Sequence, residues 1–85
     1  MHYTYVIYSE IFNEIYIGQT NNIRSRLMKH NSGMVRSTKR YMPWLLVYHE
    51  EFKTRVEAMK REKELKSHKG RDFIRELVRT KLPPD

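Results

Sequence analysis

The chain has 85 residues, with 17 lysines and arginines against 10 aspartates and glutamates, a net charge of +7. A chain of this size buries only a modest core, so we expect one domain over residues 1–85 with one functional site. Cysteine is absent, which excludes disulfides, and the four histidines lack the short spacing of a structural zinc site. Without a signal-like start or a long apolar run, we expect a soluble, cytoplasmic protein that does not enter the membrane.

Two β-strands open the chain. Residues 3–8 and 14–18 are rich in aromatic and β-branched side chains, and the connection between them is short enough for a hairpin. A turn centred between Glu10 and Ile11 would place Tyr5 opposite Tyr16, with both rings on one face of the sheet. A slip of one residue would separate the rings, so this pairing depends on the register.

A helix follows the second strand. Asn21 or Asn22 can cap its first N–H groups, and Gly33 supplies the positive φ angle that ends many helices. Arg26 and His30 lie four residues apart, which places both side chains on one helix face beside the predicted core.

Residues 34–43 have no stable hydrophobic period and predict a basic loop. Together with the preceding helix, this loop belongs to a stretch, residues 24–49, that contains six lysines and arginines and no acid. Such a concentrated positive charge is typical of a protein that binds a polyanion, most simply nucleic acid. A solubilising charge excess is the alternative, and it explains the mixed charges of the last third better than it explains this stretch.

A third strand and a long helix come next. Residues 44–49 are apolar on both faces, which predicts a strand in a well-covered position. Thr54 and Glu57 have capping-box spacing and predict a helix that continues to Ser67 or His68.

One acidic side chain interrupts the predicted apolar face of this helix. Glu62 falls inside the arc of apolar positions, where a carboxylate is costly unless it is paired, hydrogen-bonded or bound to a metal. Lys66, one turn later, is a candidate partner. The expected apolar positions are Val56, Ala58, Met59 and Leu65.

We expect Gly70 to separate this helix from a last one, which ends before Leu82–Asp85. The last helix carries an apolar stripe at helical spacing, formed by Phe73, Ile74, Leu77 and Val78. The predicted class is therefore α+β, with the element order β-β-α-β-α-α.

At this point the motifs resemble the catalytic core of the GIY-YIG endonucleases, particularly the small stand-alone bacterial members. Tyr3-Thr4-Tyr5 takes the position of the GIY triplet, with tyrosine for glycine and threonine for isoleucine, and Tyr16-Ile17-Gly18 matches YIG to the letter. Arg26, His30 and Glu62 follow in the expected order. The likeness also includes Gly18-Gln19-Thr20, the segment from Thr38 to Pro43-Trp44, and Ala58-x-x-x-Glu62.

The resemblance implies a three-stranded antiparallel sheet flanked by helices, with a concave face that hydrolyses a phosphodiester using one divalent metal, Mg²⁺ or Mn²⁺. It implies DNA more than RNA as the partner. The catalytic residues that it implies are Tyr5, Tyr16, Arg26, His30 and Glu62.

These residue types suit that chemistry. A carboxylate at Glu62 is a hard oxygen ligand for Mg²⁺ or Mn²⁺, while an ion pair with Lys66 is the alternative. Arg26 offers a planar fork for phosphate oxygens, although most single arginines on helices only pack their stems on the core. His30 can shuttle a proton or orient a hydroxyl, although a histidine near a helix end often serves only the helix dipole.

The two tyrosines and the basic loop complete the candidate site. Tyr5 and Tyr16 can orient water or phosphate, and either can act as a general base if cations lower its pKa; ordinary strand aromatics are the alternative. We expect Tyr41 or Trp44 to stack on bases. The residues expected to bind nucleic acid are Arg36, Thr38, Lys39, Arg40, Tyr41 and Lys66.

Two other functions remain open. The fold can be a nucleic-acid-binding module without cleavage, which would follow if Glu62 bonded Lys66 and no metal. It can also be an interaction domain of a larger complex, using the apolar surface around Phe73 and Leu77. We expect a monomer, with a protein partner as the alternative.

Overall fold

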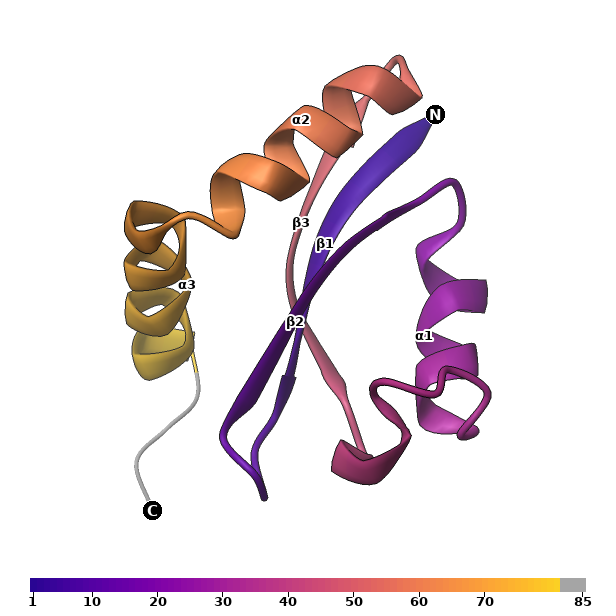
Figure 1. Ribbon diagram of the computed structural model, residues 1–85, viewed down its shortest axis with the longest axis vertical. Coiled ribbons are helices and arrows are strands. Elements are labelled where there is room, and N and C mark those ends of the chain that lie inside the picture. Colours follow the sequence, from indigo (N-terminus) through magenta and orange to yellow (C-terminus); the bar gives the residue numbers. More distant parts are fainter. Residues whose placement is uncertain (82–85) are drawn as a thin grey trace.

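The computed structural model describes residues 1–81; the predicted chain end at Leu82–Asp85 lies outside them. Its centre is an antiparallel sheet in the order β2-β1-β3, with helix α1 on one side and helices α2 and α3 on the other (Figure 1). The predicted fold class and element order are confirmed. The elements are β1 (His2–Ser9), β2 (Glu14–Thr20), α1 (Ile23–Asn31), the single 3-10 turn η1 (Lys39–Tyr41), β3 (Leu45–Phe52), α2 (Arg55–Leu65) and α3 (His68–Lys81).

The register of the β1–β2 hairpin differs from the prediction by two residues. Tyr5 pairs with Gly18, and Tyr16 pairs with Ile7, so the predicted Tyr5–Tyr16 pair is wrong. The physical reason lies in the turn, where Asn13 adopts a positive φ of 53° and shifts the turn centre toward β2. Because side chains alternate with a period of two, the shift keeps both tyrosines on one face, as predicted.

Alternation along β1 divides the interior into two cores. On the face toward α1, Tyr5 and Ile7 pack with Trp44. On the opposite face, Val6 packs with side chains of α2 and α3, including Leu65 and Ile74. The sheet is therefore covered on both faces, and only the edges of β2 and β3 lead from one core to the other.

The predicted covered position of the third strand is wrong, because β3 is an edge strand that pairs only with β1 among the described residues. Its apolar side chains are correspondingly divided. Val47 is buried, whereas Leu45 and Leu46 are exposed. Trp44 is also buried, directly before the strand begins.

The predicted caps at the starts of α1 and α2 are confirmed. The Asn22 side chain accepts a hydrogen bond from the Ser25 amide at the start of α1. At the start of α2, the Thr54 hydroxyl accepts from the Glu57 amide, while the Glu57 carboxylate accepts from the Thr54 amide. These bonds fix where α1 and α2 begin, and thereby which residues face the sheet.

Helix α2 buries a narrower face than its sequence predicts. Ala58 and Leu65 are buried, but Val56 and Met59 are exposed, so their assignment to the buried arc is wrong. The reason is close contact: the Ala58 carbonyl accepts a hydrogen bond of 2.6 Å from the Thr4 hydroxyl, which leaves room against the strand for small side chains only.

We predicted that Gly70 separates the last two helices, and this prediction is wrong. Gly70 lies in the first turn of α3. A Cβ atom there would collide with the backbone of Glu64 and Leu65, so the glycine allows α3 to pack tightly against the end of α2. Within residues 1–81, no helix has the length and apolar character needed to cross a bilayer.

Candidate active site

The hydroxyl of Tyr5 is the centre of the candidate site. It lies 2.9 Å from Nε2 of His30 and accepts a longer hydrogen bond, 3.4 Å, from Nε of Arg26. The capped helix α1 presents Arg26 and His30 to this point because they are one helical turn apart on its inner face. The predicted proximity of the tyrosine, arginine and histidine is therefore observed.

Gly18 makes room for the Tyr5 hydroxyl. A Cβ atom on Gly18 would lie 2.7 Å from that hydroxyl oxygen and 2.8 Å from the adjacent ring carbon. Since Gly18 pairs with Tyr5 in the edge strand β2, the missing side chain lets the phenol lie across this edge. The sequence contained the signal, because glycine inside a strand often marks a close approach, but the prediction gave Gly18 no such role.

Tyr16 joins the same cluster through its ring. The ring centroid of Tyr16 lies 4.9 Å from that of His30, 6.3 Å from that of Tyr5 and 6.5 Å from that of Trp44. These distances are typical of packed aromatic pairs. Tyr16 keeps part of its surface exposed, so its hydroxyl side borders the site while its ring supports His30.

His30 is fully buried and bonded at both ring nitrogens. Nδ1 lies 2.8 Å from the Thr38 hydroxyl, and Nε2 faces Tyr5. Burial, and then the nearby charge of Arg26, lower the pKa of His30 to about 4. His30 is therefore neutral at pH 7, so one ring nitrogen carries a hydrogen and the other accepts a hydrogen bond.

The Tyr5 phenol and the Arg26 guanidinium both have raised pKa values. Burial raises the pKa of the Tyr5 phenol, the hydrogen bond from Arg26 opposes that shift, and the charges of Tyr16 and Glu62 add to it more weakly. The bond to Tyr5 raises the pKa of Arg26, with a smaller contribution from Tyr16. A protonated phenol thus lies beside a permanent cation.

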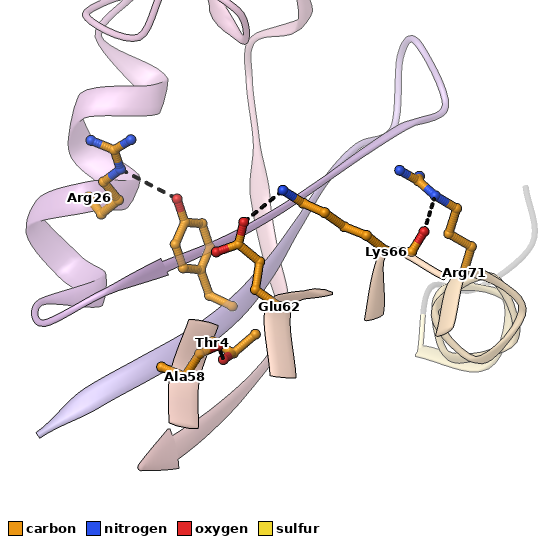
Figure 2. A network of polar contacts seen from close by, with 7 residues as sticks. Thr4, Arg26, Ala58, Glu62, Lys66 and Arg71 are labelled. Carbon is orange, nitrogen blue, oxygen red and sulfur yellow. Dashed lines mark hydrogen bonds and ion pairs between the residues drawn. The ribbon is translucent and has the colours of Figure 1, made fainter. Parts of the chain in front are cut away.

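Glu62 reaches the site from the other side of the sheet. Helix α2 contacts β1 and β2 on the face opposite α1, and the Glu62 side chain is 23% exposed near the β2 edge. Its Oε2 forms an ion pair with Nζ of Lys66 at 2.7 Å. In the view of Figure 2 the carboxylate lies between Arg26 and Lys66. Its contact with the cluster is electrostatic, because its charge acts on the Tyr5 phenol.

The donor set for a cation is a single carboxylate. Among residues 1–81, no three acidic, histidine or cysteine side chains gather as a metal cluster. Glu62 still fits a Mg²⁺ or Mn²⁺ site of the kind that keeps most of its waters. Lys66 contacts only Oε2 of the carboxylate, and the side chain is partly exposed, so Oε1 can bind a hydrated cation. The residues therefore fit a hydrated cation bound by one protein ligand.

A polar depression of about 270 Å³ opens beside Arg26 at the start of α1. Its walls include Lys29 and the amide-bearing Asn21 and Asn22, of which Asn22 caps the first turn of the helix. A larger, mostly apolar groove on α1 has none of the predicted catalytic residues in its lining. The smaller depression is therefore the better candidate for an anionic group.

The predicted nucleic-acid contacts separate into two groups. Arg36, Lys39 and Arg40 are exposed, and Tyr41 is partly exposed with the Arg40 guanidinium 5.4 Å from its ring centroid. Lys66 is exposed but bonded to Glu62.

Two of the predicted contacts are wrong. Thr38 is 1% exposed, because its hydroxyl bonds His30 and its carbonyl accepts from the Trp44 indole. Trp44 is buried between Tyr16 and Tyr41, so it cannot stack on a base.

A family model described as the GIY-YIG catalytic domain matches residues 1–75. The chain belongs to the GIY-YIG family. The match covers every predicted catalytic residue of this GIY-YIG domain and all three strands. It supports a nuclease-like family assignment, which agrees with the resemblance seen in the two triplets.

Relatives of this GIY-YIG domain bear the name UPF0213. A UPF0213 protein of Staphylococcus haemolyticus is 40% identical over 67 residues, covering 78% of this chain and 80% of that protein. One of Bacillus pumilus is 40% identical over 81 residues, covering 92% and 82%. The solution NMR structure of a UPF0213 protein from Bacillus halodurans is 30% identical, covers 89% of this chain and 83% of that chain, and gives a TM-score of 0.53.

The buried, neutral His30 predicts acid sensitivity. Its pKa falls from an ordinary 6.5 to about 4 on folding, so the unfolded chain binds more protons between those values. The contribution of neutral His30 to the free energy of unfolding is therefore complete above pH 6.5. As the pH falls toward 4, the free energy of unfolding decreases by on the order of 3 kcal/mol. Urea unfolding of the wild type and of His30→Gln between pH 7 and 4 measures it.

The difference between the two proteins isolates the contribution of His30 from the other titrating groups. We expect the wild type to lose more free energy of unfolding than His30→Gln across this range. Parallel curves for the two proteins would contradict a buried neutral imidazole.

Proposed function

We propose that this GIY-YIG domain hydrolyses phosphodiester bonds in nucleic acid, with DNA favoured over RNA, and requires one divalent cation, Mg²⁺ or Mn²⁺. The observation that supports this most strongly is the meeting of Arg26, His30 and Gly18 around the Tyr5 hydroxyl. A purely structural strand tyrosine needs none of these at once. Buried titratable groups whose pKa values are shifted by a specific charged partner gather at functional sites, and Tyr5 beside Arg26 is such a group.

Arg26 would bind the scissile phosphate. Its Nε is directed to Tyr5, which leaves the two terminal nitrogens of the guanidinium for phosphate oxygens. The adjacent depression carries Lys29, whose charge also favours an anion. Charge that grows on the phosphate oxygens would thus meet a fixed cation.

Tyr5 and Tyr16 would orient the attacking water. Both phenols border the Arg26 guanidinium, so a phosphate held there lies within reach of their oxygens. His30 would act on Tyr5 by holding its hydroxyl at 2.9 Å, while the Tyr16 ring packs against the imidazole. The aromatic packing would keep these groups in one geometry during the reaction.

Glu62 would hold the divalent cation near this phosphate. A bound cation would polarise the phosphate and offset the charge on the leaving oxygen. The present partner of Glu62, Lys66, is half exposed and one helical turn away, a pair worth only about 0.3–0.5 kcal/mol. So weak a pair would not prevent the carboxylate from binding a cation.

The exposed lysine and arginine side chains of the basic loop would bind backbone phosphates away from the cleavage point. Arg36, Lys39 and Arg40 lie in the acid-free stretch of the chain, and Tyr41 offers a ring for stacking. Lys66 would add a further contact.

We infer that the protein acts as a monomeric single domain in the reducing cytoplasm, where the absence of cysteine has no cost.

A non-catalytic nucleic-acid-binding module is the second candidate. The Glu62–Lys66 ion pair supports it, since a carboxylate whose purpose is that pair has no role in binding a cation. The two candidates differ in one measurable respect, because only the nuclease needs the charge of Glu62 for turnover.

Replacing Glu62 tests the nuclease. With plasmid or branched DNA and Mg²⁺ or Mn²⁺, we expect Glu62→Gln to lower kcat by about 100-fold or more, because stabilisation by the cation is lost. The matched control is Glu64→Gln, the same chemical change on an exposed side chain of the same helix, which should cleave like the wild type. Cleavage by Glu62→Gln at the wild-type rate would contradict the proposal.

The basic loop predicts a strong dependence of binding on salt. Each phosphate contact contributes a slope of about −0.9 to the logarithm of the binding constant against the logarithm of salt concentration. We expect Lys39→Ala to reduce the magnitude of the wild-type slope by about 1, and Lys69→Ala, on the exposed side of α3, to leave it unchanged. Filter binding with duplex DNA measures both; equal slopes for all three proteins would exclude the loop from the interface.

A further inference from the structure

Thr38 is buried beside the candidate site and has no assigned part in it. Its hydroxyl oxygen lies 2.8 Å from Nδ1 of His30, and its own O–H donates to the Val35 carbonyl at 3.3 Å. A hydroxyl has one hydrogen, so once that hydrogen is donated to Val35 the oxygen can only accept from His30. In this arrangement Nδ1 of the imidazole carries the hydrogen.

We propose that Thr38 is a positioning residue that fixes His30 as the Nδ1–H tautomer, and thereby turns Tyr5 into the hydrogen-bond acceptor for the attacking water. This inference rests on the proposed nuclease function. It assigns the orienting role to Tyr5 over Tyr16, because only Tyr5 is bonded to the imidazole.

The direction of the hydrogen bonds carries the inference. With Nδ1 protonated, Nε2 of neutral His30 is an acceptor, and the Tyr5 hydroxyl donates to it across 2.9 Å. The hydrogen of Tyr5 then points away from the reaction space, and the Tyr5 oxygen presents its lone pairs to Arg26 and to whatever binds there. A phenol held this way can accept a hydrogen bond from water but cannot donate one.

The opposite direction leaves a hydrogen without a partner. If Thr38 donated to Nδ1, Nε2 would donate to Tyr5, and the Tyr5 oxygen would accept from both His30 and Arg26. Its own hydrogen would then have no acceptor among the described residues, whereas the first direction gives the hydrogens of Thr38, His30 and Tyr5 a protein acceptor each. Buried donors are nearly always paired, which favours the first direction.

The surroundings of Thr38 prevent it from moving. Its backbone carbonyl accepts a 3.0 Å hydrogen bond from the Trp44 indole, and its amide donates to Val35. Trp44 is in turn bonded at its own amide and carbonyl by the Asn31 side chain, at the end of α1. The loop that carries Thr38 is thus attached to the helix that carries His30, and this attachment holds the Thr38 hydroxyl within hydrogen-bonding distance of Nδ1.

Nitrogen-15 NMR of the histidine rings tests this directly. In the wild type at pH 7, we expect the shift of a protonated nitrogen at Nδ1 of His30 and of an unprotonated nitrogen at Nε2. Thr38→Val removes the acceptor and should allow the Nε2–H tautomer, whereas Thr38→Ser keeps the hydroxyl and should retain the wild-type pattern. A wild-type His30 protonated at Nε2, or a Thr38→Val protein with an unchanged tautomer, would overturn the inference.

Cleavage kinetics give the second readout. Partners that orient a functional imidazole are typically worth about 10- to 100-fold in activity, so we expect that loss in kcat for Thr38→Val, with KM changed less than kcat and recovery in Thr38→Ser. Circular dichroism confirms that each variant is folded. Absence of cleavage by the wild type would overturn the proposed function, whereas an Nε2–H tautomer in an active wild type would overturn only the inference.

Discussion

The structure depends on one steric constraint: the Tyr5 hydroxyl occupies the space that a side chain on Gly18 would fill. The two residues pair across β1 and β2, so the phenol lies over the edge strand β2, on the face of the sheet that α1 covers. From there it meets Nε2 of His30 and Nε of Arg26 on one side of the sheet. Any larger residue at position 18 would displace the group on which the other contacts converge.

That position also explains how one candidate site draws on both faces of the sheet. Helix α1, which carries Arg26 and His30, covers one face, and α2, which carries Glu62, covers the other (Figure 1). The edge of β2 is where the two faces meet, and Glu62 lies close enough to it for its charge to act on Tyr5.

Local patterns predicted much of this fold because local physics determines it. The caps at Asn22 and Thr54, and the shared helix face of Arg26 and His30, need only short-range spacing. The hairpin register depends on the backbone conformation of the turn at Asn13, which the strand pattern does not contain. The edge position of β3 and the burial of Thr38 depend on contacts between distant segments, which spacing does not contain. Thr38 was therefore assigned to nucleic acid, although its hydroxyl faces His30.

The central claim is that a divalent cation binds at the β2 edge, between Glu62 and the Tyr5 cluster. Titration of the protein with Mn²⁺, followed by paramagnetic broadening of its NMR signals, measures this without a substrate. The account predicts that the signals of Glu62 and Gly18 broaden first, that those of Asp72 on α3 do not, and that excess Mg²⁺ restores them. Broadening centred on other acids, with Glu62 unaffected, would contradict it.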